Sequence, residues 1–251
     1  MPKTSWGPVA NWYDDLLESG DSTYQRELIL PNLLRIAGIK PGTTVADLAC
    51  GQGFFSRALH EVSARVIGID VSKALIDIAR ARSPKTMEWH VAPADNAPMI
   101  KDHSMDLVII ILAIQNINNM KTVFKECARI LSTNGRIIFM LNHPAFRIPK
   151  RSSWGWDDQN KSQYRRVDQY LTEKTTEIQM HPGGDPSLTT VSYHRSLQVY
   201  SKSLANTGFC IKRLEEWAGN KVSQKGPRAI AENRIRKEIP LFLMIEAIKY
   251  S

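Results

Sequence analysis

Residues 45–53, Val-Ala-Asp-Leu-Ala-Cys-Gly-Gln-Gly, carry the most informative motif of the sequence. An apolar strand of residues 44–49 runs into a tight glycine turn, and the turn opens a helix of residues 54–62. Glycine lets a ligand approach the backbone closely, and a helix N-terminus offers unpaired N–H groups. Asp70 ends the next predicted strand, where a carboxylate can accept both hydroxyls of a ribose. The pattern therefore predicts a site for an adenosine-containing ligand.

The rest of the chain alternates strands with helices, which predicts an α/β fold. We expect a doubly wound, mostly parallel, seven-stranded Rossmann-like sheet with helices on both faces. The predicted helices cover residues 9–37 (with a break at Pro31), 54–62, 73–82, 121–131, 196–207 and 228–238. The predicted strands cover residues 44–49, 64–70, 87–92, 106–112, 136–141, 209–217 and 241–250.

Residues 143–194 interrupt this alternation, and we interpret them as an inserted lid in a single domain of residues 1–251. The segment is rich in Trp, Arg, Lys, Gln and Ser. Its sequence His-Pro-Gly-Gly-Asp-Pro, residues 181–186, is a strong turn signal. Residues 174–180 and 188–194 are therefore expected to pair as a hairpin across that turn.

The composition restricts the class of protein. The chain has 251 residues, of which 43% are hydrophobic, enough for one sizeable core. The longest apolar run, Leu107 to Ile114, is too short to cross a bilayer, and no signal peptide is evident. Three widely spaced cysteines suggest no metal site and indicate a reducing compartment, which we expect to be the cytoplasm. No pattern indicates an oligomeric state. The net charge of +8 favours anionic partners, so nucleic acid stays possible.

Two features distinguish among adenosine cofactors. A dinucleotide fingerprint requires a third small residue at the position held by Ser56, and the aromatic residues Phe54 and Phe55 crowd the region of a pyrophosphate. Asp47, just before the turn, repels a phosphate but suits an ammonium group. A ligand with an amino-acid end, an adenosine and no phosphate fits both features. S-adenosyl-L-methionine (SAM) has this chemistry.

These motifs resemble those of class I SAM-dependent methyltransferases, especially the UbiE-like group that acts on small molecules. DLACGQG resembles the DLGCGTG motif, with Ala49 in place of glycine, and GIDVS resembles the motif that ends in the ribose-binding acid. The sequences ADNAP and SMDLV, at residues 94–98 and 104–108, resemble the third and fourth motifs. The resemblance implies that Asp95 receives the adenine amino group and that helix residues close over the cofactor. The cofactor-binding residues predicted in this way are Tyr13, Tyr24, Asp47, Ala49, Cys50, Gly51, Gly53, Asp70, Val71, Ala94, Asp95, Asn96, Ala113 and Gln115.

The residues that act on the acceptor are harder to predict. Methyl transfer needs a general base only if the nucleophile is protonated, because the sulfonium is already activated. The candidate bases are His143 after the fifth strand, His194 at the exit of the lid, and Tyr164 within it. Basic and aromatic lid residues could bind a carboxylate, a phosphate or a flat ring; the candidates are Arg147, Trp154, Trp156 and Arg165. A charged, solvent-exposed loop explains the same composition without function.

Four functions stay open from the sequence. The first is a SAM-dependent methyltransferase for a small organic acceptor, possibly anionic or aromatic. The second is an RNA or protein methyltransferase that uses the basic lid, although no appended RNA-binding module is evident. The third is an NAD-type oxidoreductase, against which Asp47 and Ser56 argue. The fourth is a SAM-binding protein without catalysis.

Overall fold

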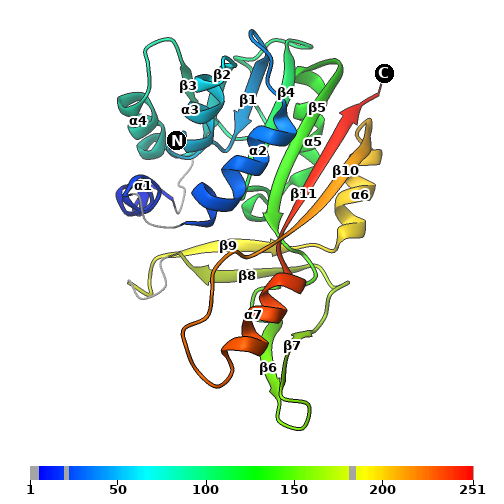
Figure 1. Ribbon diagram of the computed structural model, residues 1–251. Coiled ribbons are helices and arrows are strands. Elements are labelled where there is room, and N and C mark those ends of the chain that lie inside the picture. The colour runs from blue at the N-terminus through cyan, green and yellow to red at the C-terminus, as the bar shows by residue number, and fades with distance from the viewer. Residues whose placement is uncertain (1–5, 20–22, 181–184, 251) are drawn as a thin grey trace.

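A seven-stranded sheet forms the centre of the protein in a computed structural model, which describes residues 6–19, 23–180 and 185–250 (Figure 1). The strand order is β10-β11-β5-β4-β1-β2-β3. Strand β11 is antiparallel to both of its neighbours, and the pairs from β5 to β3 are parallel. This confirms the predicted mostly parallel Rossmann-like sheet. The strands are β1 (Thr44–Leu48), β2 (Arg65–Asp70), β3 (Glu88–Val91), β4 (Met105–Ile111), β5 (Leu131–Asn142), β10 (Phe209–Ala218) and β11 (Pro240–Lys249).

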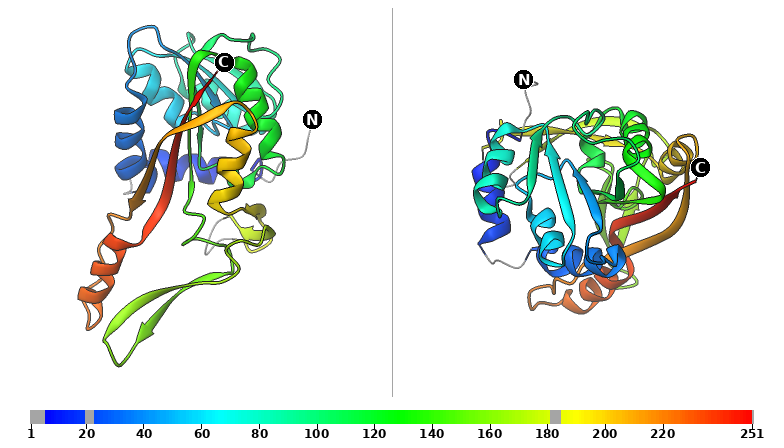
Figure 2. Two further views of the ribbon diagram at one scale, coloured as in Figure 1. Left: turned by 90° about the vertical axis from the view of Figure 1, so that its right-hand side faces the viewer. Right: turned by 90° about the horizontal axis from the view of Figure 1, so that it is seen from above.

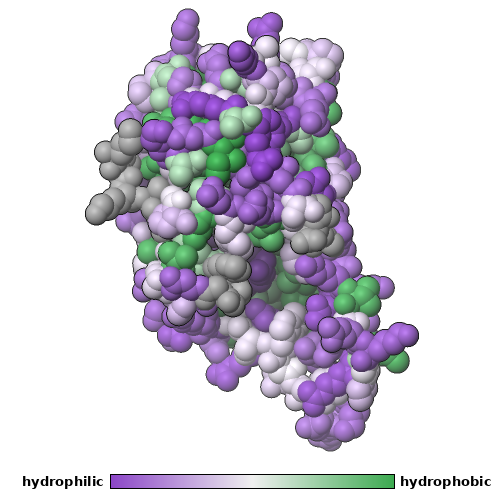
Figure 3. Space-filling view, turned by 90° about the vertical axis from the view of Figure 1, so that its left-hand side faces the viewer, coloured by the Kyte–Doolittle hydropathy of each residue, from purple (hydrophilic) through white to green (hydrophobic). Residues whose placement is uncertain are grey.

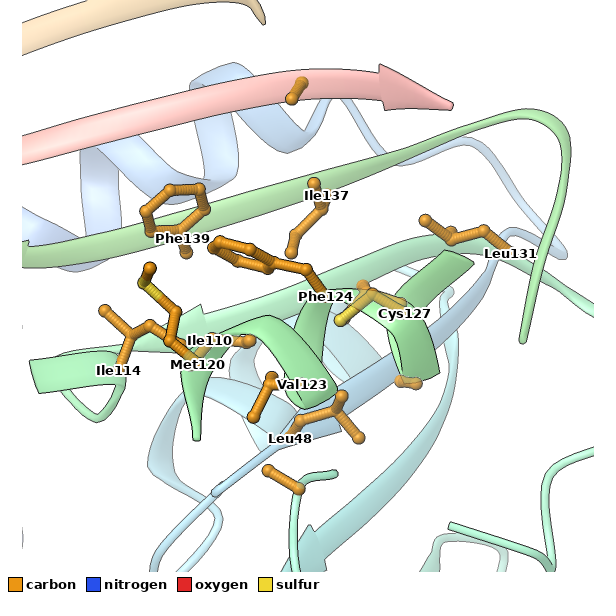
Figure 4. Close-up of a cluster of buried hydrophobic side chains, with 14 of the residues drawn as sticks. Leu48, Ile110, Ile114, Met120, Val123, Phe124, Cys127, Leu131, Ile137 and Phe139 are labelled. Atoms are coloured by element: carbon orange, nitrogen blue, oxygen red, sulfur yellow. The ribbon is translucent and has the colours of Figure 1, made fainter. Parts of the chain in front are cut away.

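Helices cover both faces of this sheet (Figure 2). Helices α5 (Met120–Ile130) and α6 (Leu197–Ala205) pack on one face. Helices α2 (Leu30–Ala37), α3 (Phe54–Glu61) and α4 (Lys73–Arg82) pack on the other, where α1 (Ala10–Glu18) contacts α4. Figure 4 shows the first of these cores, in which Phe124 of α5 meets Phe139 of β5 with ring centroids 5.3 Å apart. The sheet is therefore buried on both sides, as long apolar strands such as β4 predict.

Two predicted boundaries are wrong. Pro31 does not separate two helices: a π-helical turn, η1 (Gln25–Ile29), runs directly into α2, and Pro31 lies in the first turn of α2. The α-helical hydrogen-bond pattern begins only after the π-helical turn, at the point where the proline supplies no N–H. Strand β5 begins at Leu131, five residues before the predicted start at 136. The expected turn is an irregularity within this strand. Asn134 there has a φ of 62°, and the register with β4 shifts between Met105 and Leu107.

The segment after β5 forms two hairpins below the carboxyl edge of the sheet (Figure 1). Strands β8 (Lys174–Gln179) and β9 (Thr189–His194) pair as expected, and residues 181–184 of the predicted turn lie outside the described residues. Strands β6 (Ser152–Asp157) and β7 (Ser162–Val167) form a second hairpin that was not predicted. It lies beside α7 (Ala229–Glu238), and we call β6, β7 and α7 together the arm. No helix in the described part of the chain is long and apolar enough to span a membrane.

Candidate cofactor site

The turn after β1 is held in an unusual backbone conformation. Ala49, Gly51 and Gly53 have φ values of 59°, 59° and 83°, in the left-handed region that favours glycine. Ala49 occupies the place where the methyltransferase motif has glycine, and it adopts the left-handed conformation nonetheless. The turn lies at the carboxyl end of β1, next to β4, where the strand order reverses. Ligands of open α/β sheets bind at this switch point.

Asp70 ends β2 and faces the glycine turn. Its Oδ2 accepts a hydrogen bond from the Gly51 N–H at 2.9 Å, and its Oδ1 accepts one from the Ser72 N–H at 2.7 Å. Burial raises the pKa of Asp70, and these backbone N–H groups oppose the rise. The side chain is thereby fixed in one rotamer. Each of its oxygens keeps a further lone pair for a ligand hydroxyl.

Asp47 is the second acid of the site and is only 2% exposed. The hydroxyl of Ser56 donates a hydrogen bond to Asp47 Oδ2 at 2.5 Å. Burial raises the pKa of Asp47 to about 7, the Ser56 hydrogen bond opposes this rise, and the charge of Asp70 adds to it. A cationic partner stabilises the ionised form of such a buried carboxylate. Ser56 thus has a role that its departure from the dinucleotide pattern did not reveal.

The indole ring of Trp89, on β3, fills the space beside the turn. A Cβ added to Gly53 would lie 2.4 Å from the Trp89 ring, and one added to Gly68 would lie 2.3 Å from it. In a dinucleotide site the second glycine of the turn lets the backbone approach a pyrophosphate. Here a side chain of the protein itself packs on that glycine. The geometry therefore disfavours a dinucleotide.

Helix α1 closes the site from the other side. Tyr13 packs on Gly51, where an added Cβ would lie 3.6 Å from its ring. Burial, followed by the charges of Asp70 and Asp47, raises the pKa of Tyr13 to about 12. A partly buried network fixes the helix: Gln52 Nε2 donates to Glu18 at 3.0 Å, and Arg57 pairs with the same carboxylate. The phenol of Tyr13 is therefore a neutral donor at physiological pH.

These elements enclose a cleft of about 310 Å³. Six predicted cofactor residues line it, and a small adjoining hollow contains two more, Asp47 and Cys50. Figure 3 shows the side of the molecule that carries α1, with a hollow between its main body and the arm. The six residues in the cleft are Tyr13, Ala49, Gly51, Asp70, Val71 and Ala113.

The other predicted cofactor residues do not line the cleft. Gly53 packs on Trp89, and Tyr24 lies against Phe242 with ring centroids 5.5 Å apart. Gln115 donates a hydrogen bond to the carbonyl of Leu112 and lines a different hollow. Ala94, Asp95 and Asn96 follow β3 on a loop beside β2, and none of them is in the lining.

Sequence reasoning missed the contribution of β9. Thr190 and Val191 line the cleft, and Asn116, after β4, donates a hydrogen bond to the Val191 carbonyl at 2.8 Å. Leu75 of α4 completes the wall beside Asp70. The hairpin was predicted, but no local pattern indicates that it lies beside the cofactor cleft.

None of the three candidate bases lines the cleft. His143 is 6% exposed, with Nε2 2.7 Å from Glu216 and Nδ1 accepting backbone N–H bonds from the next turn. Burial lowers the pKa of His143, and Glu216 opposes this effect. His194 Nε2 lies 2.8 Å from the Tyr170 carbonyl. Tyr164 packs on Gly155 in the arm. His194 lines a smaller hollow that also contains Asn116 of the cleft, and a catalytic role for any of the three stays a prediction.

The predicted acceptor-binding residues divide into two groups. Arg147, Trp154 and Arg165 line one cavity of about 290 Å³ between the arm and β11. Trp156 lies elsewhere, beneath the guanidinium of Arg228, which is 4.5 Å from its ring centroid. The described residues contain no cluster of His, Cys, Asp and Glu that could hold a metal ion.

Known proteins are similar to this chain in sequence and in fold. Residues 46–139 match the family model described as a methyltransferase domain. The chain is 27% identical over 113 residues to demethylmenaquinone methyltransferase from Tropheryma whipplei, which covers 44% of this chain and 46% of that protein. It is 28% identical over 144 residues to malonyl-[acyl-carrier protein] O-methyltransferase from Legionella pneumophila, which covers 56% and 47%. The chain thus spans about half the length of these relatives.

A solved SAM-dependent methyltransferase from Mesorhizobium loti has the same architecture, with a TM-score of 0.68 and 26% identity over 87% of this chain and 96% of that one. The sheet order, the glycine turn and the two acids define a class I fold that binds SAM. Residues 46–139 match a methyltransferase domain, and the fold of the chain is that of class I SAM-dependent methyltransferases.

Proposed function

We propose that this protein transfers a methyl group from SAM to a small organic acceptor. One observation carries the proposal: Asp47 and Asp70 flank a single glycine turn whose second glycine is covered by Trp89. The two buried carboxylates suit a cofactor that has an ammonium group and a ribose. Because the covered glycine leaves no room for a pyrophosphate, this cofactor should carry no phosphate. The small acceptor is supported by the relative named demethylmenaquinone methyltransferase.

SAM supplies an activated methyl group, which leaves the sulfonium as the acceptor forms its new bond. The residues of the chain bind and orient. Asp70 would accept hydrogen bonds from the ribose hydroxyls, and Asp47 would lie opposite the ammonium group. Tyr13 would cover the cofactor and exclude water, which raises the rate through placement and desolvation.

The lining of the cleft, as far as the structure describes it, contains no histidine, lysine or cysteine that could act as a base. Its titratable side chains are the phenol of Tyr13 and the carboxylate of Asp70, which the cofactor itself would engage. We therefore infer that the acceptor presents a nucleophile that needs no strong base, such as an amine, an acidic hydroxyl or a stabilised carbanion.

A labelling experiment tests this function. The protein is incubated with SAM labelled on the methyl group and with a cell extract separated into small molecules, RNA and protein. We expect the label in the small-molecule fraction. Asp70→Asn should abolish the transfer, whereas Asp77→Asn, an exposed acid on α4 paired with Lys73, should leave it intact. Label in RNA or protein alone would contradict the small acceptor, and no transfer in any fraction would favour a SAM-binding protein without catalysis.

A further inference from the structure

A second cavity, of about 290 Å³, lies where the arm meets the end of the sheet. Four cationic side chains line it: Arg147 after β5, Arg165 of β7, Lys221 before α7 and Arg236 of α7. The lining contains no carboxylate among the described residues. None of the four forms a salt bridge with any residue that the structure describes. Four cations from separate elements thus converge on one space without a counter-charge.

Two cations of the arm that do not line the cavity have carboxylate partners. On the same arm, Arg166 pairs with Asp168 at 2.8 Å and Arg234 pairs with Glu238 at 3.3 Å. Arg166 and Arg165 are neighbours in β7 and so point to opposite faces of the hairpin. Only Arg165 faces the cavity. Within β7, the arginine on the outer face is therefore paired with a carboxylate and the arginine on the cavity face is not.

The two partly buried arginines of the cavity are held in place. Arg165 donates hydrogen bonds to the Phe146 carbonyl and to the Ser152 hydroxyl, each at 2.7 Å, and its guanidinium lies 4.8 Å from the Trp154 ring centroid. Arg147 lies 5.2 Å from the Phe242 ring centroid. Burial lowers the pKa of Arg147, and the charge of Arg165 adds to this effect. An anion in the cavity would relieve both the desolvation and the repulsion.

Flat apolar surfaces complete the cavity. Tyr24, Phe146 and Trp154 contribute rings, and Leu241 adds an aliphatic side chain. Gly219 lets this wall close, because a Cβ there would lie 2.9 Å from Leu241 and 3.1 Å from the Tyr24 hydroxyl. Rings beside unpaired cations suit a planar ligand that carries a negative charge.

The cavity is linked to the cofactor cleft through shared residues. Arg147 also lines a smaller hollow of about 60 Å³, which contains Asn116, and Asn116 lines the cofactor cleft as well. Three hollows thus follow one another along the carboxyl edge of the sheet. A ligand held by its charged end at Arg147 and Arg165 would have its other end directed toward Asn116.

We propose that this basic cavity binds the anionic end of an aromatic acceptor, with a carboxylate or a phosphate between Arg147 and Arg165. The assignment of the ligand as methyl acceptor rests on the proposed function, whereas the binding of an aromatic anion does not. Trp156, which faces Arg228 on the outer part of the arm, is not part of this site.

Three fluorescent probes with the same ring test the cavity: 1-naphthoate, 1-naphthyl phosphate and neutral 1-naphthol. We expect both anions to bind at least tenfold more tightly than 1-naphthol, because only the anions form charge-assisted hydrogen bonds with the two guanidinium groups. The tighter of the two anions identifies the natural group as carboxylate or phosphate. Equal binding of the neutral and anionic probes would overturn the proposal.

Variants locate the binding. Arg165→Met and Arg147→Met should each weaken the anionic probes at least tenfold and leave 1-naphthol nearly unchanged, while Arg166→Met is the matched control and should bind all three as the wild type does. If Arg147→Met does not fold, Arg165→Met alone tests whether the probes bind in this cavity. Equal losses in Arg165→Met and Arg166→Met would contradict the site.

SAM binding, measured in parallel, should be unchanged in every variant. A wild-type protein that binds naphthoate but not SAM would refute the proposed function, while the binding role of the cavity would stand.

Discussion

The cofactor cleft and the basic cavity have similar volumes, about 310 and 290 Å³, but opposite charges. Buried acids define the first, and unpaired cations define the second. The cleft is built on β1, β2 and β4, whose buried ends fix each side chain within the sheet. The cavity is built where the arm meets β11, and its cations come from elements far apart in sequence. The comparison indicates that one molecule separates a site for a cation from a site for an anion.

The largest expected effect comes from Asp70. Asp70→Asn should weaken SAM binding roughly 100-fold or more, because hydrogen bonds to a charged group contribute about 1.5–3 kcal/mol each. Binding of 1-naphthoate should be unchanged in the same variant. Calorimetric titration with each ligand provides the measurement, with Asp77→Asn as control. A parallel loss of both ligands would mean that the two sites are not independent.

The contact between Trp89 and Gly53 gives the second prediction. Gly53→Ala and Gly42→Ala both place a side chain at a positive φ, of 83° and 86°, but Gly42 has nothing within 4 Å. The left-handed conformation costs about 1–2 kcal/mol in each, and the indole contact should add roughly 1–3 kcal/mol in Gly53→Ala alone. Thermal or urea unfolding measures the difference. Equal destabilisation of the two variants would show that Trp89 yields and that room for a phosphate can be made.

The pKa of Asp47 predicts a pH dependence. With a pKa of about 7, Asp47 is mostly ionised at pH 7.5 and mostly protonated at pH 6. SAM affinity should therefore fall about tenfold between these two values, because only the carboxylate form attracts the ammonium group. Asp47→Asn should bind SAM weakly and lose most of this dependence. Affinities that stay constant with pH in the wild type would contradict the role of Asp47.

The same burial affects the stability of the unliganded protein. The folded-state pKa of Asp47, about 7, lies above the ordinary value of 3.8, so folding favours the protonated acid. Stability is lost as the pH rises through the folded pKa. Asp47→Asn should therefore raise the unfolding midpoint at pH 8 and change it little at pH 4. Differential scanning fluorimetry without ligand tests this sign.

Ser56 gives the smallest expected effect. Its hydroxyl donates to Asp47 and holds the pKa of that acid down. Ser56→Ala should shift the pH midpoint of SAM binding upward and lower the affinity at pH 7.5 a few-fold. Ser203→Ala, whose side chain lies on α6 away from the site, should behave as the wild type does. An unshifted midpoint would mean that the hydrogen bond is not maintained in solution.

The sequence predicted the sheet well because its strands are buried runs with clear ends. Leu107 to Ile111 is apolar throughout, which only a strand covered on both faces requires. The hairpin of β6 and β7 was not predicted, because its exposed strands carry mixed polar residues rather than a regular alternation. Pro31 was taken as a break because a lone proline does not reveal whether it lies in the first turn of a helix.

The two acids of the cofactor cleft could be predicted from local sequence, whereas the surroundings of the candidate bases could not. Asp47 and Asp70 follow from local spacing, since each ends or nearly ends a strand beside the turn. The environment of His143 depends on Glu216, which lies 73 residues later in the chain. The ring that covers Gly53 comes from Trp89, on another strand. Long-range contacts of this kind decide which polar side chains face a ligand, and no spacing encodes them.

Side-by-side calorimetry with SAM and NAD at pH 7.5 shows which class of cofactor the cleft binds. A cleft with two buried acids and an indole-covered glycine should bind SAM and should not bind NAD at a comparable concentration. Tight binding of NAD without binding of SAM would contradict the assignment of the cleft.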